Sequence, residues 1–338
     1  MMALIWLIVG LALILWGANA LTDGAASVAS RLGVSNLVIG LTVVAFGTSA
    51  PELVISIVSA VNGSAPLAVG NTVGSNIFNI LAIIGITALV RPIKVERTVM
   101  TTELPIVLLS SVVIWALGNS SWINGFGGNV ISRTDGIFLL LAFALFMRHT
   151  FATARPRHTT AAGLNVPLEP ISTSDQSPVA DEVKTKEMPV WRALLWILLG
   201  LGALIFGGDR FVAGASSIAI RAGISEGVVG LTIVAIGTSL PELATSVVAA
   251  VKGKPGLAVG NVIGSNIFNI FFVLGITSTI APLPFEGIDN MDLGTLLVAS
   301  ILFYLFAWVY KKRTITRTEG MVLLLCYVGY MTALILRL

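Results

Sequence analysis

Two stretches of the chain, residues 40–85 and 230–275, have nearly the same sequence. Aligned at a constant offset of 190 and without a gap, they share 29 identical residues in 46 positions. The register continues upstream, where Trp6 pairs with Trp196. Repetition on this scale constrains the fold more than any other feature, because whatever structure one half forms, the other half must form as well.

Each half contains five apolar stretches. Hydrophobic residues make up 56% of the chain and charged residues only 11%. Because a bilayer core about 30 Å thick takes about 20 apolar residues per helix, we expect each stretch to cross a membrane. The ten predicted spans are Leu4–Leu21, Leu37–Val61, Leu67–Val90, Leu104–Gly118, Gly136–Phe151, Ala193–Gly208, Val228–Val251, Leu257–Ile280, Leu293–Tyr310 and Gly320–Leu336.

An odd number of spans per half has a topological consequence. The second copy must enter the membrane from the side opposite to the first, so a pseudo-two-fold axis in the membrane plane relates the halves. The predicted fold is an all-α membrane protein with ten transmembrane helices in two inverted five-helix repeats. The repeats occupy residues 1–147 and 193–338, and residues 148–192, rich in Thr, Ser and Pro, form a linker between them.

The distribution of basic residues predicts the orientation in the membrane. If the N-terminus is outside, sixteen of the 20 Lys and Arg residues fall on the cytoplasmic side, and only Arg133, Arg210, Arg221 and Arg337 fall outside. We therefore expect both termini outside and the linker in the cytoplasm. The formal charge of +3 comes from these basic loops and does not indicate a nucleic-acid partner.

Glu52 and Glu242 occupy equivalent positions in the two halves. Of the 17 carboxylate residues, these are the two predicted to lie well inside a span, where insertion costs about 2.5–3.5 kcal/mol. No Lys or Arg is predicted inside a span to neutralise them. A buried structural acid is the alternative interpretation, but the recurrence favours a functional role.

A proline precedes each glutamate. Pro51 and Pro241 lack an N–H, which leaves the carbonyl four residues earlier without its helical partner. Such oxygens are tolerated at membrane depth where they line a cavity or meet a ligand. The helical period then places a set of oxygen-bearing residues on one face in each half: Ala45, Thr48, Ser49 and Glu52, and Ala235, Thr238, Ser239 and Glu242.

The third span of each half also carries polar residues at helical spacing. Ser75 and Asn79 share a face, as do Ser265 and Asn269. Groups of this kind commonly join transmembrane helices by hydrogen bonds. Their recurrence beside an acid in both halves favours a second role in the same site.

The candidate ligands are all oxygen atoms, which suit Ca²⁺ and Na⁺ rather than zinc or copper. Two negative charges balance one Ca²⁺ or two Na⁺, so the two ions would compete for one site. The single cysteine, Cys326, excludes a cysteine cluster. The sequence shows no nucleotide loop or catalytic triad, so we do not expect an enzyme. It also indicates no resident cofactor and no obligate protein partner.

The repeated motifs GLTVVAFGTSAPEL with AVGNTVGSNIFNI, and GLTIVAIGTSLPEL with AVGNVIGSNIFNI, resemble the two alpha repeats of the calcium/cation antiporter superfamily, most closely its prokaryotic sodium/calcium exchangers. The resemblance implies alternating access in a bacterial or archaeal inner membrane. It implies that Glu52 and Glu242 bridge the ions and that Asn79 and Asn269 face each other at the centre. The other implied ligands are carbonyls of Thr48, Thr238, Ala45 and Ala235 and hydroxyls of Ser49, Ser239, Ser75 and Ser265.

The chain departs from some of these relatives at Asn269, where several carry an aspartate. The missing carboxylate leaves the number of Na⁺ ions and any potassium dependence open. Exchange of Ca²⁺ for H⁺, or of another cation such as Mn²⁺ or K⁺, is therefore the alternative to Na⁺/Ca²⁺ exchange. A channel or a non-transporting scaffold is a third interpretation.

Overall fold

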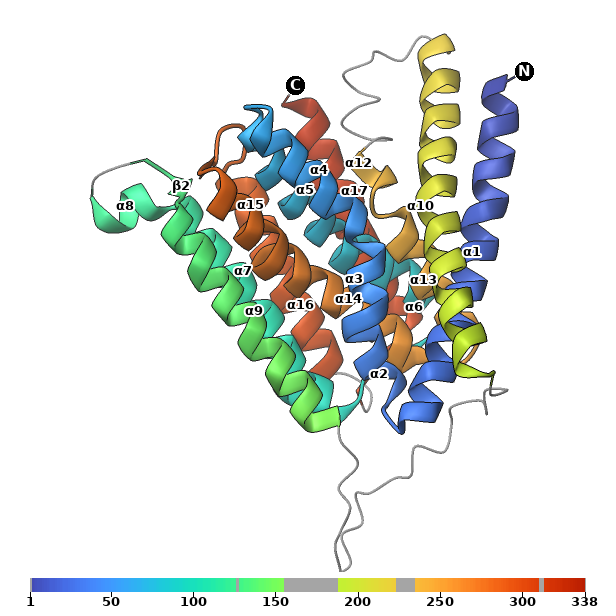
Figure 1. The fold of residues 1–338 in the computed structure, drawn as a ribbon. Helices are drawn as coiled ribbons and strands as arrows, with labels where there is room; N and C mark the ends of the chain where they lie inside the picture. Colours follow the sequence, from blue (N-terminus) through green and yellow to red (C-terminus); the bar gives the residue numbers. More distant parts are fainter. Residues whose placement is uncertain (1, 126–127, 155–187, 223–234, 310–312, 338) are drawn as a thin grey trace, which may run out of the picture.

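A computed structural model describes residues 2–125, 128–154, 188–222, 235–309 and 313–337. The described chain is a bundle of long helices (Figure 1). Two minimal pairs of antiparallel strands, β1 with β4 and β2 with β3, join loops at the helix ends.

The first half contains α1 (Met2–Leu32), α2 (Asn36–Ile39), η1 (Gly40–Val44), α3 (Ala45–Thr48), α4 (Ala50–Val61), α5 (Ala65–Ile77), η2 (Phe78–Ile83), α6 (Ile84–Val90), β1 (Ile93–Lys94), η3 (Val99–Glu103), α7 (Leu104–Gly118), α8 (Ser120–Asn124), β2 (Val130–Ile131) and α9 (Arg133–Ala154), where η denotes a π-helix.

The second half contains α10 (Val190–Arg221), α12 (Ala235–Gly237), α13 (Leu240–Val251), α14 (Pro255–Ile267), η5 (Phe268–Val273), α15 (Leu274–Ile280), β3 (Leu283–Pro284), α16 (Asn290–Val309), β4 (Thr314–Ile315) and α17 (Arg317–Leu336). The elements from α4 to β1 recur as those from α13 to β3 at the offset of 190. Both third spans, for example, change from α-helix to π-helix at the equivalent residues Phe78 and Phe268.

Eight helices of the described chain are long and apolar enough to cross a membrane, and a ninth span is the bent pair 36–48 and 50–61. The chain is therefore a multi-pass integral membrane protein. The predicted seventh span, Val228–Val251, lies partly outside the described residues, which resume at Ala235. Its C-terminal part is the apolar helix α13.

The structure corrects several predicted boundaries. The first and sixth spans are longer than predicted, since α1 and α10 extend by more than a turn beyond Leu21 and Gly208. The fourth span begins at Val99, which places Glu103 inside it and buries this carboxylate. Helix α9 continues to Ala154, into the region predicted as linker. Most of the predicted linker, residues 155–187, lies outside the described residues.

The equivalent helices α1 and α10 pack side by side and run antiparallel at one edge of the molecule (Figure 1). Glycines at their interface bring the two backbones together. A Cβ atom at Gly17 would lie 2.7 Å from the carbonyl oxygen of Gly200, and one at Gly200 would lie 2.8 Å from that of Gly17. Any larger residue would force the helices apart, so the glycines permit the two backbones to approach closely.

The third span of each half lies at the centre of the bundle. The most apolar 18-residue window of α5–η2–α6 is 78% buried, and that of α14–η5–α15 is 94% buried. Each central span also contacts the last helix of the opposite half: Gly85 lies against Gly320 of α17, and Gly275 lies against Gly136 of α9. The halves are thus interlocked around a core that both contribute.

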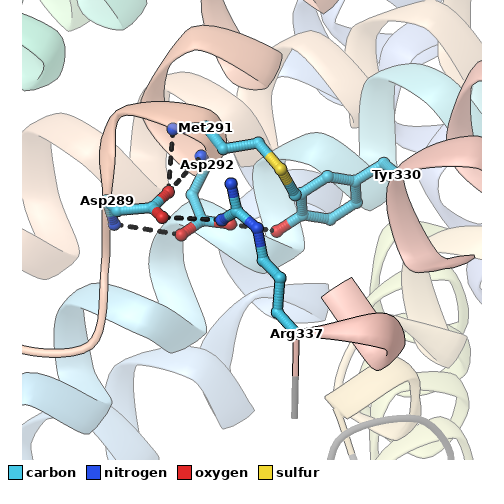
Figure 2. Close-up of polar contacts among 5 residues, drawn as sticks. All are labelled: Asp289, Met291, Asp292, Tyr330 and Arg337. Carbon is cyan, nitrogen blue, oxygen red and sulfur yellow. Dashed lines mark hydrogen bonds and ion pairs between the residues drawn. The ribbon is translucent and has the colours of Figure 1, made fainter. Parts of the chain in front are cut away.

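Helix α17 is tied at its end to the loop before α16 (Figure 2). The guanidinium of Arg337 pairs with the Asp289 carboxylate at 2.6 Å, and the Tyr330 hydroxyl donates to Asp292 at 2.8 Å. Burial raises the pKa of Asp289, but the N–H groups of Met291 and Asp292 and the charge of Arg337 outweigh this effect. The pKa of this carboxyl is therefore held below its usual value.

Candidate cation-binding site

Both glutamates lie just after a break in their helix. Ser49 separates α3 from α4 with φ −86° and ψ 9°, and Ser239 separates α12 from α13 with φ −92° and ψ 7°. The break at Ser49 bends the span by 44°. Because prolines occupy the start of the new helices, Glu52 and Glu242 fall in their first turns, where the helix dipole favours negative charge.

The two glutamates are held by residues of the opposite half. The Ser49 hydroxyl donates to Oε1 of Glu242 at 2.9 Å, and the Ser239 hydroxyl donates to Oε1 of Glu52 at 3.3 Å. Thr238 adds a side-chain hydrogen bond to Glu52. Each glutamate is only 1% exposed. The crossed pair of bonds places the two breaks against each other, so the site lies on the boundary between the halves.

The second carboxylate oxygen of each glutamate remains available. Oε2 of Glu52 and Oε2 of Glu242 have no hydrogen-bond partner within the described part of the chain. The ion pairs found among the described residues involve other carboxylates. Two buried, uncompensated anionic groups are strongly unfavourable, and a bound cation would neutralise them.

Two asparagines that the sequence analysis did not single out brace the glutamate helices. The side-chain amide of Asn71 donates to the backbone carbonyl of Glu52 at 3.4 Å and to Ser56 at 3.3 Å. Asn261 makes the equivalent bonds to Glu242 at 3.3 Å and to Ser246 at 3.0 Å. Asn71 and Asn261 each precede a predicted ligand, Ser75 or Ser265, by four residues, and this spacing is the signal that could have identified them.

The centre of the site is rich in amides. Asn76 donates to the Asn266 carbonyl at 3.2 Å, and Asn269 donates to the Asn76 side chain at 3.1 Å. The hydrogen bond of Asn269 therefore goes to Asn76, a residue that the sequence analysis did not name. Neither side-chain polar atom of Asn79 has a partner in the described chain.

Several predicted ligands have unused oxygens, and others do not. Asn269 Oδ1 is buried without a partner among the described residues, and Ser265 lies beside the Glu242 carboxylate. Ser75 is 4% exposed, and no hydrogen bond joins it to either glutamate in the described chain. Buried polar oxygens without a protein partner are uncommon, and bound water or an ion is a common explanation for them.

The alanine positions differ between the halves, whereas Thr48 lies beside Glu242 as Thr238 lies beside Glu52. The Thr48 hydroxyl donates to Asn261 Oδ1 at 3.2 Å and to the Ala45 carbonyl at 3.4 Å. The Ala45 carbonyl also accepts the N–H of Ser49, whereas the N–H of Ser239 bonds to Ile236 rather than to Ala235. The Ala45 carbonyl is thus occupied by its own helix, in contrast to the expected ligand role.

A groove of about 690 Å³ approaches the site between α10 and α4. Its walls include Pro51 and Thr238, which flank Glu52, together with apolar side chains such as Val54 and Phe206. Neither glutamate lines the groove. The groove therefore comes close to the carboxylates beside the middle of α10, without reaching them.

The sodium/calcium exchanger protein family model matches residues 2–152 and 192–336 of the chain. The chain belongs to this family. It is 38% identical over 333 residues to the putative antiporter CaxA of Alkalimonas amylolytica, covering 98% of each chain. It is 32% identical over 343 residues to the sodium/calcium exchanger MaX1 of Methanosarcina acetivorans, covering 97% of each chain.

The fold also matches solved structures. A structure of the sodium-calcium exchanger NCX_Mj soaked with 2.5 mM Na⁺ and 0.1 mM Ca²⁺ superimposes with a TM-score of 0.80 and 30% sequence identity, covering 99% of each chain. The superposition spans both halves, so the arrangement of helices around the glutamates is that of a membrane exchanger. The family resemblance stated from the motifs is confirmed.

Proposed function

We propose that the protein exchanges Ca²⁺ for Na⁺ across the membrane, with Glu52 and Glu242 as the shared charged ligands. The observation that carries the proposal is the pair of free Oε2 atoms on carboxylates that are 1% exposed. One Ca²⁺ or two Na⁺ neutralise this pair, so the two ions displace each other. Ser265 Oγ and the amide oxygens of Asn79 and Asn269 supply further hard ligands of the kind Ca²⁺ and Na⁺ prefer.

Alternating access accounts for transport from both faces. Antiparallel packing of the equivalent helices α1 and α10 is what an inverted repeat requires, and it supports the predicted ten-helix, two-repeat architecture. The close glycine contact between the two helices favours their movement as one unit across the glutamate helices. Ions would then leave on one side and enter on the other.

The test is ⁴⁵Ca²⁺ uptake into proteoliposomes loaded with Na⁺ or, separately, given a pH gradient. We expect uptake to depend on the Na⁺ gradient and to fall to background in Glu52→Gln and Glu242→Gln. Glu103→Gln is the matched control, because Glu103 is also a buried carboxylate inside a span but makes no hydrogen bond to the site in the described chain. Its variant should retain uptake.

Each alternative has its own signature in this assay. Uptake driven by the pH gradient alone would replace Na⁺ coupling with H⁺ coupling. Flux without any gradient would overturn antiport. Loss of uptake in the Glu103 control as well would show that removing any buried carboxylate destroys the fold, and would remove the support for a specific site.

We also propose that both termini lie on the outer, non-cytoplasmic side of the membrane and that the linker is cytoplasmic. The support is the distribution of Lys and Arg over the loops. A fluorescent protein fused to the C-terminus that folds only in the cytoplasm should stay dark. A bright fusion would reverse the orientation.

A further inference from the structure

The end of α16 forms a pocket of about 490 Å³ with the segment that leads into η3. Helix α16 finishes at the end of the bundle where α9 finishes and α10 begins (Figure 1). We propose that this basic pocket binds the phosphate-bearing headgroup of an anionic phospholipid. Its lining residues in the described chain are Arg97, Met100, Thr101, Tyr304, Trp308 and Arg313.

The backbone fixes the two arginines of the pocket close to each other. Strands β1 and β4 pair antiparallel just before Arg97 and just after Arg313. The N–H of Val95 donates to the carbonyl of Arg313 at 2.8 Å. Arg313 has a φ of 62°, a left-handed conformation that is uncommon for a non-glycine residue and that turns the chain sharply at this point. The two guanidinium groups are therefore brought to one site by main-chain contacts that do not depend on their side chains.

The guanidinium groups of Arg97 and Arg313 are not used within the described protein. Other arginines at this end of the bundle cap helices, as Arg91 does by donating to the carbonyl of Ala250 at 3.3 Å and Arg317 by donating to that of Leu89 at 3.0 Å. Within the described residues, neither pocket arginine makes such a bond or an ion pair. Two free guanidinium groups facing one pocket match the geometry and charge of a phosphate.

The aromatic wall places the pocket at headgroup depth. Tyr304 and Trp308 contact each other edge to face with ring centroids 5.7 Å apart, and Trp308 is 62% exposed. The membrane-spanning part of α16 ends at Trp308. Because Trp and Tyr prefer the boundary between hydrocarbon and headgroups, an anion bound here would be attached to a lipid whose chains lie beside α16.

The equivalent position in the other half is filled. Tyr304 and Trp308 correspond to Ile114 and Gly118 of α7, and Gly118 is covered by Leu293 and Phe285. The repeat therefore does not by itself create the pocket. The positions equivalent to Arg97 and Arg313 in the repeat are Gly287 and Ile123, so the other half offers neither the aromatic pair nor the two arginines.

The pocket can be tested with the full-length protein in nanodiscs or detergent. Native mass spectrometry would compare retention of phosphatidylglycerol with that of phosphatidylcholine of the same chains. Two interfacial arginines predict a preference for phosphatidylglycerol of about 30-fold. Arg97→Gln with Arg313→Gln should remove this preference. Arg192→Gln, which removes an exposed arginine at the start of α10 on the same side, should keep it.

Other outcomes decide against the proposal. Equal retention of both lipids by the wild-type protein, or an unchanged preference in the double variant, would overturn it. Displacement of the lipid by millimolar inorganic phosphate would show that the pocket binds a free anion and would overturn the assignment to a lipid. The elution profile on size exclusion confirms that each variant is folded, and loss of the preference in Arg192→Gln would indicate a general effect of surface charge.

Discussion

The two sides of the glutamate pair are built from the same repeated sequence, but they differ in packing. On the α1 side, α1 packs along α13, and Thr48 is fully buried. On the α10 side, the equivalent contact between α10 and α4 is sparse, and the groove between them reaches the partly exposed Thr238. A symmetric sequence has thus produced one closed approach and one open approach to the same site.

The two sides also differ in an ion pair, which is present on the α1 side. Asp23 of α1 accepts from Lys252 at 2.8 Å, and Lys254 lies 3.8 Å away. The residues at the equivalent positions of the other half, 213, 62 and 64, are Ala, Asn and Ser. The repeat therefore supplies two similar sides, and the closed side carries an ion pair that the other side lacks.

The largest expected effect is a difference in access. In a Cys326→Ala background, Thr238→Cys should react with a small membrane-impermeant thiol reagent faster than Thr48→Cys. If the opposite state is populated at about 0.1–10%, the ratio of rates is about 10 to 1000. Stopped labelling followed by mass spectrometry measures both rates. Equal rates at the two threonine positions would show that the two sides are equally accessible and would contradict this account.

A smaller effect is expected when the ion pair is removed. Asp23→Asn should raise the labelling rate of Thr48→Cys. The ion pair stabilises only the state in which the α1 side is closed, so removing it shifts the population toward the open state. Partly exposed ion pairs contribute up to about 1 kcal/mol, which corresponds to about fivefold. The charge-swapped combination of Asp23→Lys with Lys252→Asp should restore the slow rate. A rate that does not change in Asp23→Asn would show that packing alone closes this side.

The smallest effect is expected at Asp289, whose ion pair joins α16 to α17 and spans neither path. Asp289→Asn should leave both labelling rates unchanged and lower the melting temperature at pH 7 by no more than about 2–4 °C.

The pKa of Asp289 is lowered from 3.8, so the stabilisation from its ion pair is complete above this value and is lost as the pH falls through the folded pKa. The melting temperatures of wild type and variant should therefore converge below pH 3.8, and a gap that widens in acid would contradict this account.

Much of the fold follows from the pattern of the sequence. The apolar stretches predicted the spans, and the prolines at 51 and 241 predicted the breaks that the structure shows after Thr48 and Gly237. Boundaries were less certain because apolar length does not show where a helix stops: α1 and α10 continue through Gly, Ala and Ser residues that pack against neighbouring helices. The same limitation applies to Glu103. Hydropathy predicts this residue just before the fourth span, whereas the span begins earlier and packing buries the carboxylate.

The glutamates themselves were predictable, since a carboxylate within an apolar segment is costly and has few explanations. Their partners were less predictable. That Ser49 bonds to Glu242 and Ser239 to Glu52, and not to the nearer glutamate in sequence, depends on how the two halves meet. The bracing roles of Asn71 and Asn261 depend in the same way on the packing of α5 on α4 and of α14 on α13.

The sequence by itself determined that this chain lies in a membrane, that it repeats, that a carboxylate recurs inside a span of each half and that the polar residues beside it carry oxygen atoms. These properties are local, because hydropathy, proline geometry and residue chemistry act within a single segment. Only the tertiary structure decided which oxygens remain free, which side of the site is open and where Arg97 meets Arg313. Each of these depends on distances between segments that are far apart in the chain, and helical periodicity sets no such distance.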